Sequence, residues 1–338
     1  MTMTLPTVDD TVIWDAWLSM YRVPALTVAL ELEIFESLDA KPDSPEGLAE
    51  RRGFDVRGLR ALLPMLRQQQ LLQLQDGAYR LNEASRAYLL KASPWFWGGL
   101  YRRIAKTLPA HKLLLETVNN ERARAAKNRP VDGWESGHVD MALARDVTAF
   151  MHSHSMAAAV GMTHNCDFSA CRRVLDVGGG SGCFSIALAL ALPDVRCTVM
   201  ELPTICELAR GYIGDAGVSD RVDTTVVDMF RQDWPQGYDM HFFSNIFHDW
   251  SIDTCLDLAK RSFAALPAGG RIVLHEMLLD DGGLTPAPAV TFSLLMAMGT
   301  LGQQFTLGQL RDILQQAGFR DITSRHSYGY YSIVSAVK

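Results

Sequence analysis

Residues 174–184 read VLDVGGGSGCF, and this stretch decides how the second half of the chain is interpreted. A short apolar run ends in Asp176, glycines follow at positions 178, 179, 180 and 182, and an apolar segment of helical length comes next. A glycine-rich turn between a strand and a helix lets backbone N–H groups and the helix N-terminus approach a ligand without interference from Cβ atoms. The stretch therefore predicts a ligand-binding loop after a buried strand.

The order of residues in this loop distinguishes two kinds of cofactor. The dinucleotide fingerprint is G-x-G-x-x-G/A, but Cys183 stands where its third small residue should be. The pattern D-x-G-x-G-x-G fits instead, with Asp176 before the turn and Gly178 and Gly180 within it. An acid there repels a pyrophosphate but suits an amino group and a sulfonium charge. We therefore favour S-adenosylmethionine over NAD.

Two further acidic positions agree with this cofactor. Glu201-Leu202, in MELP, closes the next β-rich run, where a carboxylate can accept both hydroxyls of a ribose. Asp228-Met229 follows the third run and offers a carboxylate for the adenine amine beside an apolar wall. Each acid also has an ordinary interpretation, because acids cap helices and end strands in many proteins.

From residue 172 onward, short β-rich runs alternate with segments of helical length. This alternation is typical of a parallel, doubly wound sheet with ligands at the carboxyl ends of its strands. The expected strands lie within residues 172–179, 196–203, 221–230, 238–247 and 270–279, and the expected helices within 182–193, 204–217 and 251–270. Residues 318–338 are expected to supply two closing strands as an antiparallel edge pair.

Residues 10–160 have mostly helical periodicity. Ser44-Pro45 is a helix-start signal and Gly53 a stop, and Asp76-Gly77 predicts a hairpin turn. Helix, short helix, helix and hairpin form a winged-helix arrangement, which often binds DNA. The third helix carries only three Arg and the net charge is −6, so a structural, dimer-forming winged helix is favoured. We expect a helical domain over residues 1–165 and a cofactor-binding catalytic domain over 166–338.

The composition, 48% hydrophobic and 21% charged, is that of an ordinary globular protein. The start MTMTLPTVDDTVIW lacks the features of a signal peptide, and no run approaches the roughly 18 apolar residues of a membrane helix. Six cysteines fall after residue 165 without a C-x-x-C, which indicates reduced thiols, with Cys183 and Cys197 as core fillers. We expect a cytoplasmic enzyme without membrane or nucleic-acid partners.

Taken together, VLDVGGGSG, MELP, VVDMF, HDW and TLGQLRDILQQAGF resemble the S-adenosylmethionine-dependent small-molecule O-methyltransferases. The resemblance covers nearly the full length and is closest to caffeate, isoflavone and hydroxyindole O-methyltransferases and to bacterial relatives that modify secondary metabolites. It implies a class I methyltransferase Rossmann-like domain after a winged-helix dimerisation domain, a homodimer, and a small aromatic or heteroaromatic acceptor. The cofactor product would be S-adenosylhomocysteine.

The resemblance also implies roles for individual residues. The turn from Gly178 to Gly182 would contact the methionine part of the cofactor, Glu201 the ribose, and Asp228 and Met229 the adenine. Met151 and Ser155, in FMHSHS, match positions near the methionine end, although this segment is equally consistent with an ordinary helix whose histidines face solvent. Ser244, followed by Asn245, stands where plant enzymes usually hold a Lys near the cofactor.

His248 matches the family's catalytic base, with Asp249 as its neighbour in HDW and Glu276 as one of two carboxylates that orient it. Gln304 stands where the second carboxylate is expected. An amide can still hydrogen-bond an imidazole, but it cannot stabilise the imidazolium by charge. We interpret His248 as the base that takes the acceptor's proton.

The acceptor pocket is expected to draw on apolar segments. Residues 291–304, which include Met296, suit an apolar wall around a planar acceptor and are equally consistent with core packing. Phe247, before the base, and Trp14, in the first helix, are further candidates, although dimer-interface burial is favoured for most residues around Trp14. A metal held by His241, His248 and His275 is disfavoured, because residues 291–304 offer no His as a second ligand.

The sequence thus favours O-methyl transfer to a phenol-, indole- or pyrrole-type hydroxyl. Two alternatives use the same scaffold, namely C-methylation of an activated carbon such as that of an α-keto acid, and hydroxylation or decarboxylation assisted by the cofactor. A winged-helix regulator that senses S-adenosylmethionine is a third alternative, of a different class.

Overall fold

A computed structural model describes residues 5–119 and 137–338 of the chain. The chain divides into two compact units. The sheet unit comprises Met1–Thr11, Pro130–Leu278 and Phe305–Lys338, and the helical unit comprises Val12–Arg129 and Leu279–Gln304. Within the described residues, no helix is both long and apolar enough to span a membrane.

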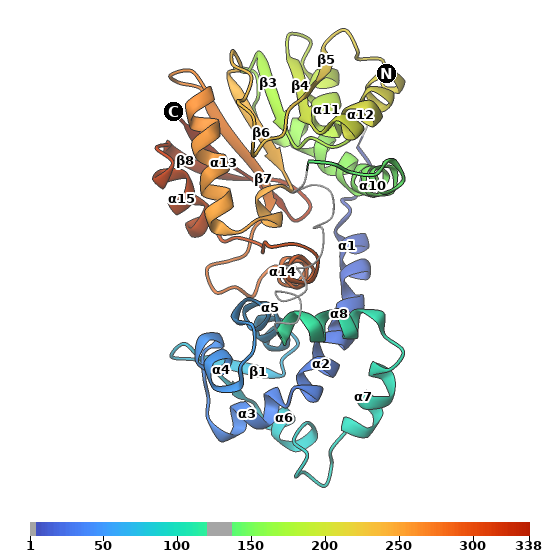
Figure 1. Ribbon diagram of the computed structural model, residues 1–338, viewed down its shortest axis with the longest axis vertical. Coiled ribbons are helices and arrows are strands. Elements are labelled where there is room, and N and C mark those ends of the chain that lie inside the picture. Colours follow the sequence, from blue (N-terminus) through green and yellow to red (C-terminus); the bar gives the residue numbers. More distant parts are fainter. Residues whose placement is uncertain (1–4, 120–136) are drawn as a thin grey trace. The chain divides into compact units, whose positions relative to one another are not determined.

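The helical unit contains short helices and one hairpin (Figure 1). Its elements are α1 (Thr11–Leu18), η1 (Ser19–Tyr21), α2 (Arg22–Glu31), α3 (Ile34–Ala40), α4 (Pro45–Arg52), α5 (Val56–Gln68), β1 (Leu72–Gln75), β2 (Ala78–Leu81), α6 (Glu83–Tyr88), α7 (Gly98–Ala105), α8 (Pro109–Val118) and α14 (Ala287–Gly299). The succession of α3, α4, α5 and the β1–β2 hairpin confirms the expected winged-helix order.

Local signals explain where these elements begin and end. The Ser44 hydroxyl accepts a bond from the Gly47 N–H at 3.1 Å and caps α4, and Gly53 ends that helix with a left-handed φ of 72°. Asp76 and Gly77 both have positive φ, 50° and 77°, as a tight two-residue hairpin requires. The predicted start, stop and turn are therefore confirmed.

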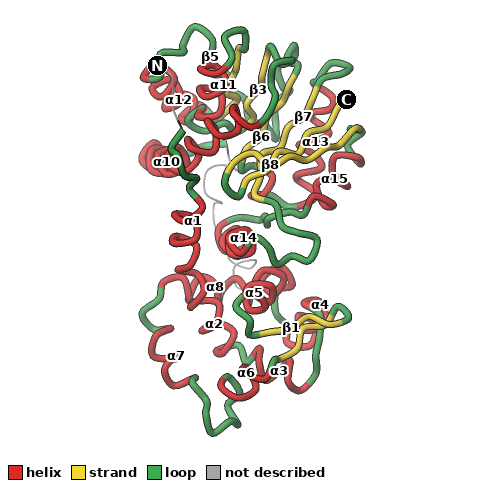
Figure 2. Tube along the Cα trace, turned by 180° about the vertical axis from the view of Figure 1, so that it is seen from behind, coloured by secondary structure: helices red, strands yellow, loops and turns green. Residues whose placement is uncertain are grey.

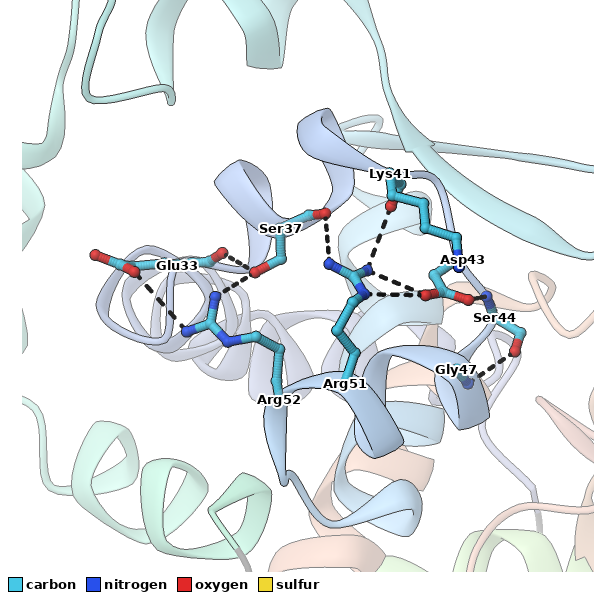
Figure 3. A network of polar contacts seen from close by, with 8 residues as sticks. All are labelled: Glu33, Ser37, Lys41, Asp43, Ser44, Gly47, Arg51 and Arg52. Carbon is cyan, nitrogen blue, oxygen red and sulfur yellow. Dashed lines mark hydrogen bonds and ion pairs between the residues drawn. The ribbon is translucent and has the colours of Figure 1, made fainter.

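Two arginines at the end of α4 fix its connection to α3 (Figure 3). Arg51 donates to the carbonyl oxygens of Ser37 and Lys41 and pairs with Asp43 at 3.1 Å. Arg52 reaches the Ser37 hydroxyl. Cationic side chains are favourable at a helix C-terminus, and here Arg51 also satisfies backbone carbonyls within and just after α3.

The arginines of α5 likewise bond within the helical unit. Arg57 donates to the carbonyl oxygens of Thr300 at 2.9 Å and Ala297 at 3.1 Å, at the C-terminal end of α14. Arg60 pairs with Glu46 at 2.8 Å, and Arg67 reaches the Gly282 carbonyl. Helix α5 packs on α14 through the core of the unit.

The sheet unit is built on a seven-stranded sheet with the order β5-β4-β3-β6-β7-β9-β8. Its elements are α10 (Met141–Asn165), β3 (Arg173–Val177), α11 (Cys183–Ala191), β4 (Arg196–Glu201), α12 (Pro203–Asp215), β5 (Val222–Val226), β6 (Met240–Ser244), η2 (Phe247–Asp249), α13 (Ile252–Ala265), β7 (Arg271–Met277), α15 (Leu307–Gln316), β8 (Arg320–Tyr328) and β9 (Tyr331–Val337). The first five strands are parallel, and β9 pairs antiparallel with β7 and β8. Both strand predictions are confirmed.

Helices cover both faces of this sheet, with α10, α11 and α12 on one side and α13 and α15 on the other (Figures 1 and 2). Successive strand residues alternate between the two layers, so that Phe242 packs with α11 and Phe243 with α13 and α15. The buried thiols Cys183 and Cys197 lie in the first layer, as core fillers. All six cysteines, which lie in described parts of the chain, are free.

The compact units do not follow a boundary at residue 165. Helix α10, which precedes that residue, packs on α11 and α12 and belongs to the sheet unit. Residues 279–304 belong to the helical unit, because α14 inserts Val290, Leu294 and Met298 into its core. The chain therefore crosses between the units more often than a division into 1–165 and 166–338 implies.

Candidate active site

The order of strands creates a switch point between β3 and β6, where a ligand crevice is expected in an α/β sheet. From β3 the chain proceeds outward to β4 and β5, and then returns to β6 on the other side of β3. In open α/β sheets, ligands bind at such a switch point, beyond the carboxyl ends of the strands. The strand ends that meet at this edge carry Gly178, Glu201, Ser244 and Glu276.

The glycine loop between β3 and α11 needs glycine for its backbone. Gly178, Gly180 and Gly182 have φ values of 66°, 56° and 76°, a left-handed region that strains other residues. A Cβ atom added at Gly180 would meet no protein atom within 4 Å. The loop thus leaves open space above Gly180, next to the N-terminus of α11, which suits a ligand with polar groups.

Asp176 lies beneath this loop. It is 1% exposed, and its Oδ2 accepts a hydrogen bond from the Ser185 hydroxyl at 2.7 Å. Burial raises the pKa of its carboxyl to about 6, against the opposing effect of the Ser185 bonds. The carboxylate supports the loop from below, and a Cβ at Gly179 would clash with it at 2.6 Å.

Glu201, at the end of β4, faces the same loop. Its Oε1 accepts a bond from the Gly180 N–H at 3.2 Å, and its Oε2 accepts one from the Leu202 N–H at 2.9 Å. The side chain is 9% exposed, and burial raises the pKa of its carboxyl to about 7. The structure therefore brings Glu201, Leu202 and the glycine loop together.

The Asp228–Met229 pair follows β5. Asp228 accepts bonds from the Phe230 N–H at 2.9 Å and from Arg231 at 2.6 Å. Met229 is partly buried, and its carbonyl accepts a bond from the Trp234 indole at 3.0 Å. The Asp228 carboxylate is thus paired with Arg231.

Helix α10 brings a histidine to the glycine loop. His152 Nδ1 lies 2.8 Å from the Ser181 hydroxyl, and its ring stacks on Tyr212 with centroids 4.3 Å apart. Met151 is partly buried beside it, and Ser155 is 5% exposed, 3.3 Å from His154 Nδ1. The segment is helical, but His152 does not simply face solvent.

His248 lies in η2, after β6, and is 3% exposed. Its Nδ1 is 3.2 Å from Oε2 of Glu276, which is 1% exposed on β7, and its Nε2 is 3.7 Å from Oδ1 of Asp249. Burial disfavours the charged imidazole, but the carboxylates of Glu276 and Asp249 outweigh it and raise the pKa of His248 above its usual value. Burial, with a contribution from His248, lowers the pKa of His154 to about 4.

Ser244 and Asn245 end β6 beside a histidine that the sequence did not suggest for this role. Ser244 Oγ lies 3.0 Å from Nδ1 of His275, and the Asn245 N–H donates to the His275 carbonyl at 3.2 Å. Asn245 is 3% exposed and has a left-handed φ of 54°. Because β6 and β7 are parallel and pair Ser244 with His275, the strand register is the signal that could have identified this contact.

The predicted pocket residues are divided between the units. Phe247 is fully buried and packs edge-to-face on Phe243 at 5.4 Å, so its side chain belongs to the core of the sheet unit rather than to an open wall. Trp14, Met296 and Gln304 belong to the helical unit and are 3%, 8% and 1% exposed. Trp14 packs against Phe292 with ring centroids 5.7 Å apart.

The histidines considered as metal ligands have separate partners. His241 bonds the Ser262 hydroxyl at 3.0 Å, and burial lowers its pKa to about 3. His275 bonds two serines, and His248 faces carboxylates. In the part of the chain that the structure describes, no group of three or more His, Cys, Asp or Glu could hold a metal ion.

Two family models match the chain. One, an O-methyltransferase domain, matches residues 112–320, and the other, an O-methyltransferase dimerisation domain, matches residues 14–91. The match of the second model covers the winged-helix elements of the helical unit, and that of the first covers the glycine loop, Glu201, His248 and Glu276.

Individual proteins are similar over most of their length. The 3-hydroxy-5-methyl-1-naphthoate 3-O-methyltransferase of Streptomyces sahachiroi is 31% identical over 97% of this chain and 95% of that protein. The L-tyrosine C(3)-methyltransferase of Streptomyces lavendulae is 28% identical over 88% of this chain and 83% of that protein. An O-methyltransferase family 2 protein from Planctomyces limnophilus, solved with apigenin, has the same fold, with a TM-score of 0.87 and 24% identity. The match covers 99% of this chain and 98% of that protein.

Proposed function

This chain belongs to the O-methyltransferase family, and from that membership we propose that it transfers the methyl group of S-adenosylmethionine to a hydroxyl of an aromatic or heteroaromatic secondary metabolite. The observation that carries the proposal is the meeting, at one edge of the sheet, of a glycine loop with open space and a buried imidazole–carboxylate pair. The first suits the cofactor, and the second suits removal of a proton from the acceptor.

The residues at the crevice fit S-adenosylmethionine. The loop from Gly178 to Gly182 would hold its methionine part, with Met151 and Ser155 nearby on α10. Glu201 and Leu202 would hold the ribose, and Asp228 and Met229 the adenine, once Asp228 exchanges its bond with Arg231 for the ligand. When bound, this cofactor supplies a methyl group on a positively charged sulfur, ready for displacement by an oxygen.

Asp176 contributes from below the loop. Its carboxylate is buried and bonded to Ser185, so we assign it to shaping the loop and to the electrostatic attraction of the cofactor's positive charges. This role is compatible with the D-x-G-x-G-x-G pattern, because the acid precedes the turn without having to touch the ligand.

His248 is proposed as the general base. With Nδ1 facing the Glu276 carboxylate at 3.2 Å, the neutral ring carries its proton on Nδ1, and Nε2 accepts the proton of the acceptor hydroxyl. Glu276 fixes this tautomer and stabilises the imidazolium that forms, with a smaller contribution from Asp249. General-base catalysis of this kind contributes typically ~10²–10⁴-fold, in addition to the alignment of oxygen, methyl carbon and sulfur.

The helical unit is proposed to serve dimerisation and acceptor binding. Its match to a dimerisation domain supports a homodimer. Trp14, Met296 and Gln304 are proposed to contribute to an apolar acceptor pocket, which suits a planar ring. We also propose a cytoplasmic location without a membrane partner.

The winged helix is proposed not to read DNA. Arg57, Arg60 and Arg67 on α5 all make bonds within the helical unit, so they are engaged rather than presented to phosphates, and the chain carries a net charge of −6. A regulator would bind duplex DNA with strong salt dependence. Absence of duplex binding at low salt is the expected result.

C-methylation is the second candidate function, because one relative is an L-tyrosine C(3)-methyltransferase. The two functions are separated by incubating the protein with methyl-¹³C-labelled S-adenosylmethionine and a panel of 3-hydroxynaphthoates, simple phenols and L-tyrosine. O-methylation places the label on oxygen in ¹³C NMR spectra, and C-methylation places it on a ring carbon. Labelling of carbon alone across the panel would contradict the proposed O-methyl transfer.

A further inference from the structure

Buried His275 has a defined position that the proposed chemistry does not yet use. Its side chain is fully buried on β7, and each ring nitrogen lies next to a serine hydroxyl. Nδ1 is 3.0 Å from Ser244 Oγ on β6, and Nε2 is 2.9 Å from Ser327 Oγ on β8. Three strands that are far apart in sequence therefore contribute one hydrogen-bonded array.

The orientation of this imidazole is fixed by aromatic neighbours. It stacks on Tyr331 with centroids 4.8 Å apart and an interplanar angle of 7°, and it contacts Phe184 with centroids 5.0 Å apart. Ser327 is itself fully buried. Such packing leaves the ring little freedom to rotate, so the position of Nδ1, and with it the direction of the Ser244 bond, is set by the core.

The outer end of the array lies at the crevice. Ser244 is the last residue of β6 and is only partly buried. The parallel register pairs Asp176 of β3 with Phe242 of β6, and Ser244 lies two residues beyond Phe242, at the end of β6. Side chains two apart on a strand share a face, so Ser244 shares the face of Phe242, which packs with α11, the helix that follows the glycine loop. The Ser244 hydroxyl therefore lies on the face of the sheet that α11 covers, at the strand end next to the switch point.

The two hydrogen bonds of the array are coupled in direction through the His275 ring. Burial lowers the pKa of His275 to about 3, so the ring is neutral and carries one N–H. One ring nitrogen donates and the other accepts, which couples the direction of the Ser244 bond to that of the Ser327 bond. A hydroxyl held in this way offers a ligand one pre-oriented group instead of a freely rotating one, and pre-orientation lowers the entropic cost of binding.

We propose that Ser327, His275 and Ser244 form a positioning array that directs the Ser244 hydroxyl at the methionine end of bound S-adenosylmethionine. In this array His275 is a positioning residue, which acts on the cofactor only through Ser244. The inference rests on the proposed function, because it assumes that the crevice binds this cofactor.

The test is a double-mutant cycle on cofactor affinity, measured by calorimetric titration of S-adenosylmethionine and S-adenosylhomocysteine into the intact protein. Ser244→Ala and His275→Phe are each expected to weaken binding about three- to tenfold, the range of one net hydrogen bond. Phenylalanine preserves the stack on Tyr331. The double variant is expected to bind the cofactor no more weakly than either single variant. A loss of affinity equal to the product of the two single losses would overturn the array.

His241→Phe is the matched control. His241 is also fully buried, lies on β6 and bonds one serine, Ser262, but it is three residues upstream of the strand end. Its replacement removes the same chemistry from the same sheet and is expected to leave cofactor affinity unchanged. If His241→Phe weakened binding as much as His275→Phe, a general loosening of the sheet would explain both, and the array would be overturned.

Steady-state kinetics separate positioning from a merely structural role. His275→Phe is expected to raise the KM for the cofactor about three- to tenfold and to leave kcat at saturating cofactor unchanged. If His275→Phe fails to fold, Ser327→Ala carries the test, with an expected loss of about twofold that disappears in the Ser244→Ala background. A loss that persists in that background would contradict the array.

The outcomes also distinguish the array from the function on which it rests. A wild-type protein that binds neither form of the cofactor would overturn both. Wild-type binding with an unchanged affinity in Ser244→Ala would overturn the array alone and leave the proposed function in place.

Discussion

His248 and Glu276 face each other in the sheet unit, with Nδ1 of the imidazole 3.2 Å from Oε2 of the carboxylate and both side chains buried. One residue follows β6 and the other lies on β7, which are adjacent parallel strands. The pairing offsets the burial of an imidazolium, since the pKa of His248 is raised in spite of burial. If His248 is the base, as proposed, it keeps its proton to a higher pH than an ordinary histidine, and activity should rise as that proton is lost.

Replacement of Glu276 by Gln should shift the pH profile of kcat/KM. In the wild type, activity rises with pH through the raised pKa of His248, because only the neutral ring accepts a proton. Loss of the carboxylate charge lowers that pKa, so the acid limb of the kcat/KM profile should move to lower pH. The plateau value of kcat/KM should fall, because the imidazolium that forms is no longer stabilised. Asp249→Asn should shift the limb in the same direction by less, since Asp249 lies 3.7 Å from Nε2 and its side chain is 36% exposed. An acid limb that stays in place in Glu276→Gln would disprove the pairing.

Replacement of Gly180 by Ala should impair cofactor binding more than folding. A methyl group there enters the open space above the loop, and the left-handed backbone adds a cost of about 1 kcal/mol to folding. Gly217→Ala is the matched control, with a φ of 69° and equally open surroundings after α12. Both variants should melt at similar temperatures in calorimetry, and only Gly180→Ala should lose at least about tenfold in affinity. Equal cofactor affinities in the two variants would show that the cofactor does not occupy the space above Gly180.

The raised pKa of Glu201 should make stability depend on pH. The unfolded carboxyl has its ordinary pKa of about 4.5 and the folded one a pKa of about 7, so the unfolded state loses its proton first as the pH rises. The wild type should therefore lose stability between these two values, and Glu201→Gln should not. The difference is on the order of 3 kcal/mol, at 1.36 kcal/mol per pKa unit. Urea denaturation of both proteins across this range measures it, and parallel curves would refute the assignment.

The same carboxylate should couple pH to cofactor affinity. An ionised Glu201 accepts the ribose hydroxyls better than a protonated one, so wild-type affinity should rise with pH through about 7. Glu201→Gln should bind more weakly and lose this component of the pH dependence. The difference between the two titration series, rather than either alone, isolates Glu201 from other groups that ionise in this range.

Arg57 should contribute to the stability of the helical unit rather than to binding of nucleic acid. Arg57→Met removes two hydrogen bonds to carbonyls at the end of α14 and should cost about 1–3 kcal/mol in thermal denaturation. Arg60→Met is the control on the same helix. Its partner Glu46 is 52% exposed and Arg60 itself 57% exposed, so its loss should stay within about 0.5 kcal/mol. Equal effects of the two changes would contradict the structural role of Arg57.

Much of the fold follows from local patterns. The alternation of β-rich and helical segments predicts the parallel sheet, and Asp76-Gly77 predicts the hairpin, because these signals depend on residues close in sequence. The assignment of α10 to the sheet unit and of α14 to the helical unit did not follow. Apolar periodicity shows that a helix has a buried face, but it does not show which neighbour covers that face.

The site was predicted unevenly for the same reason. The glycine loop and Glu201 could be proposed from the sequence, because a motif and a strand end locate them directly. His275 inside an apolar β run offers no such signal, since its proposed role depends on Ser244 and Ser327 in other strands. Phe247, expected at the acceptor pocket, is fully buried in the core of the sheet unit, where its ring packs on Phe243.

The measurement that tests the account most directly is the single-turnover rate of methyl transfer in His248→Ala and His248→Gln, with the acceptor identified from the labelled panel. The account predicts that both variants bind S-adenosylmethionine as tightly as the wild type in calorimetry and transfer the methyl group ~10²–10⁴ times more slowly. Transfer at the wild-type rate in either variant, with the product still methylated on oxygen, would contradict the assignment of His248 as the base.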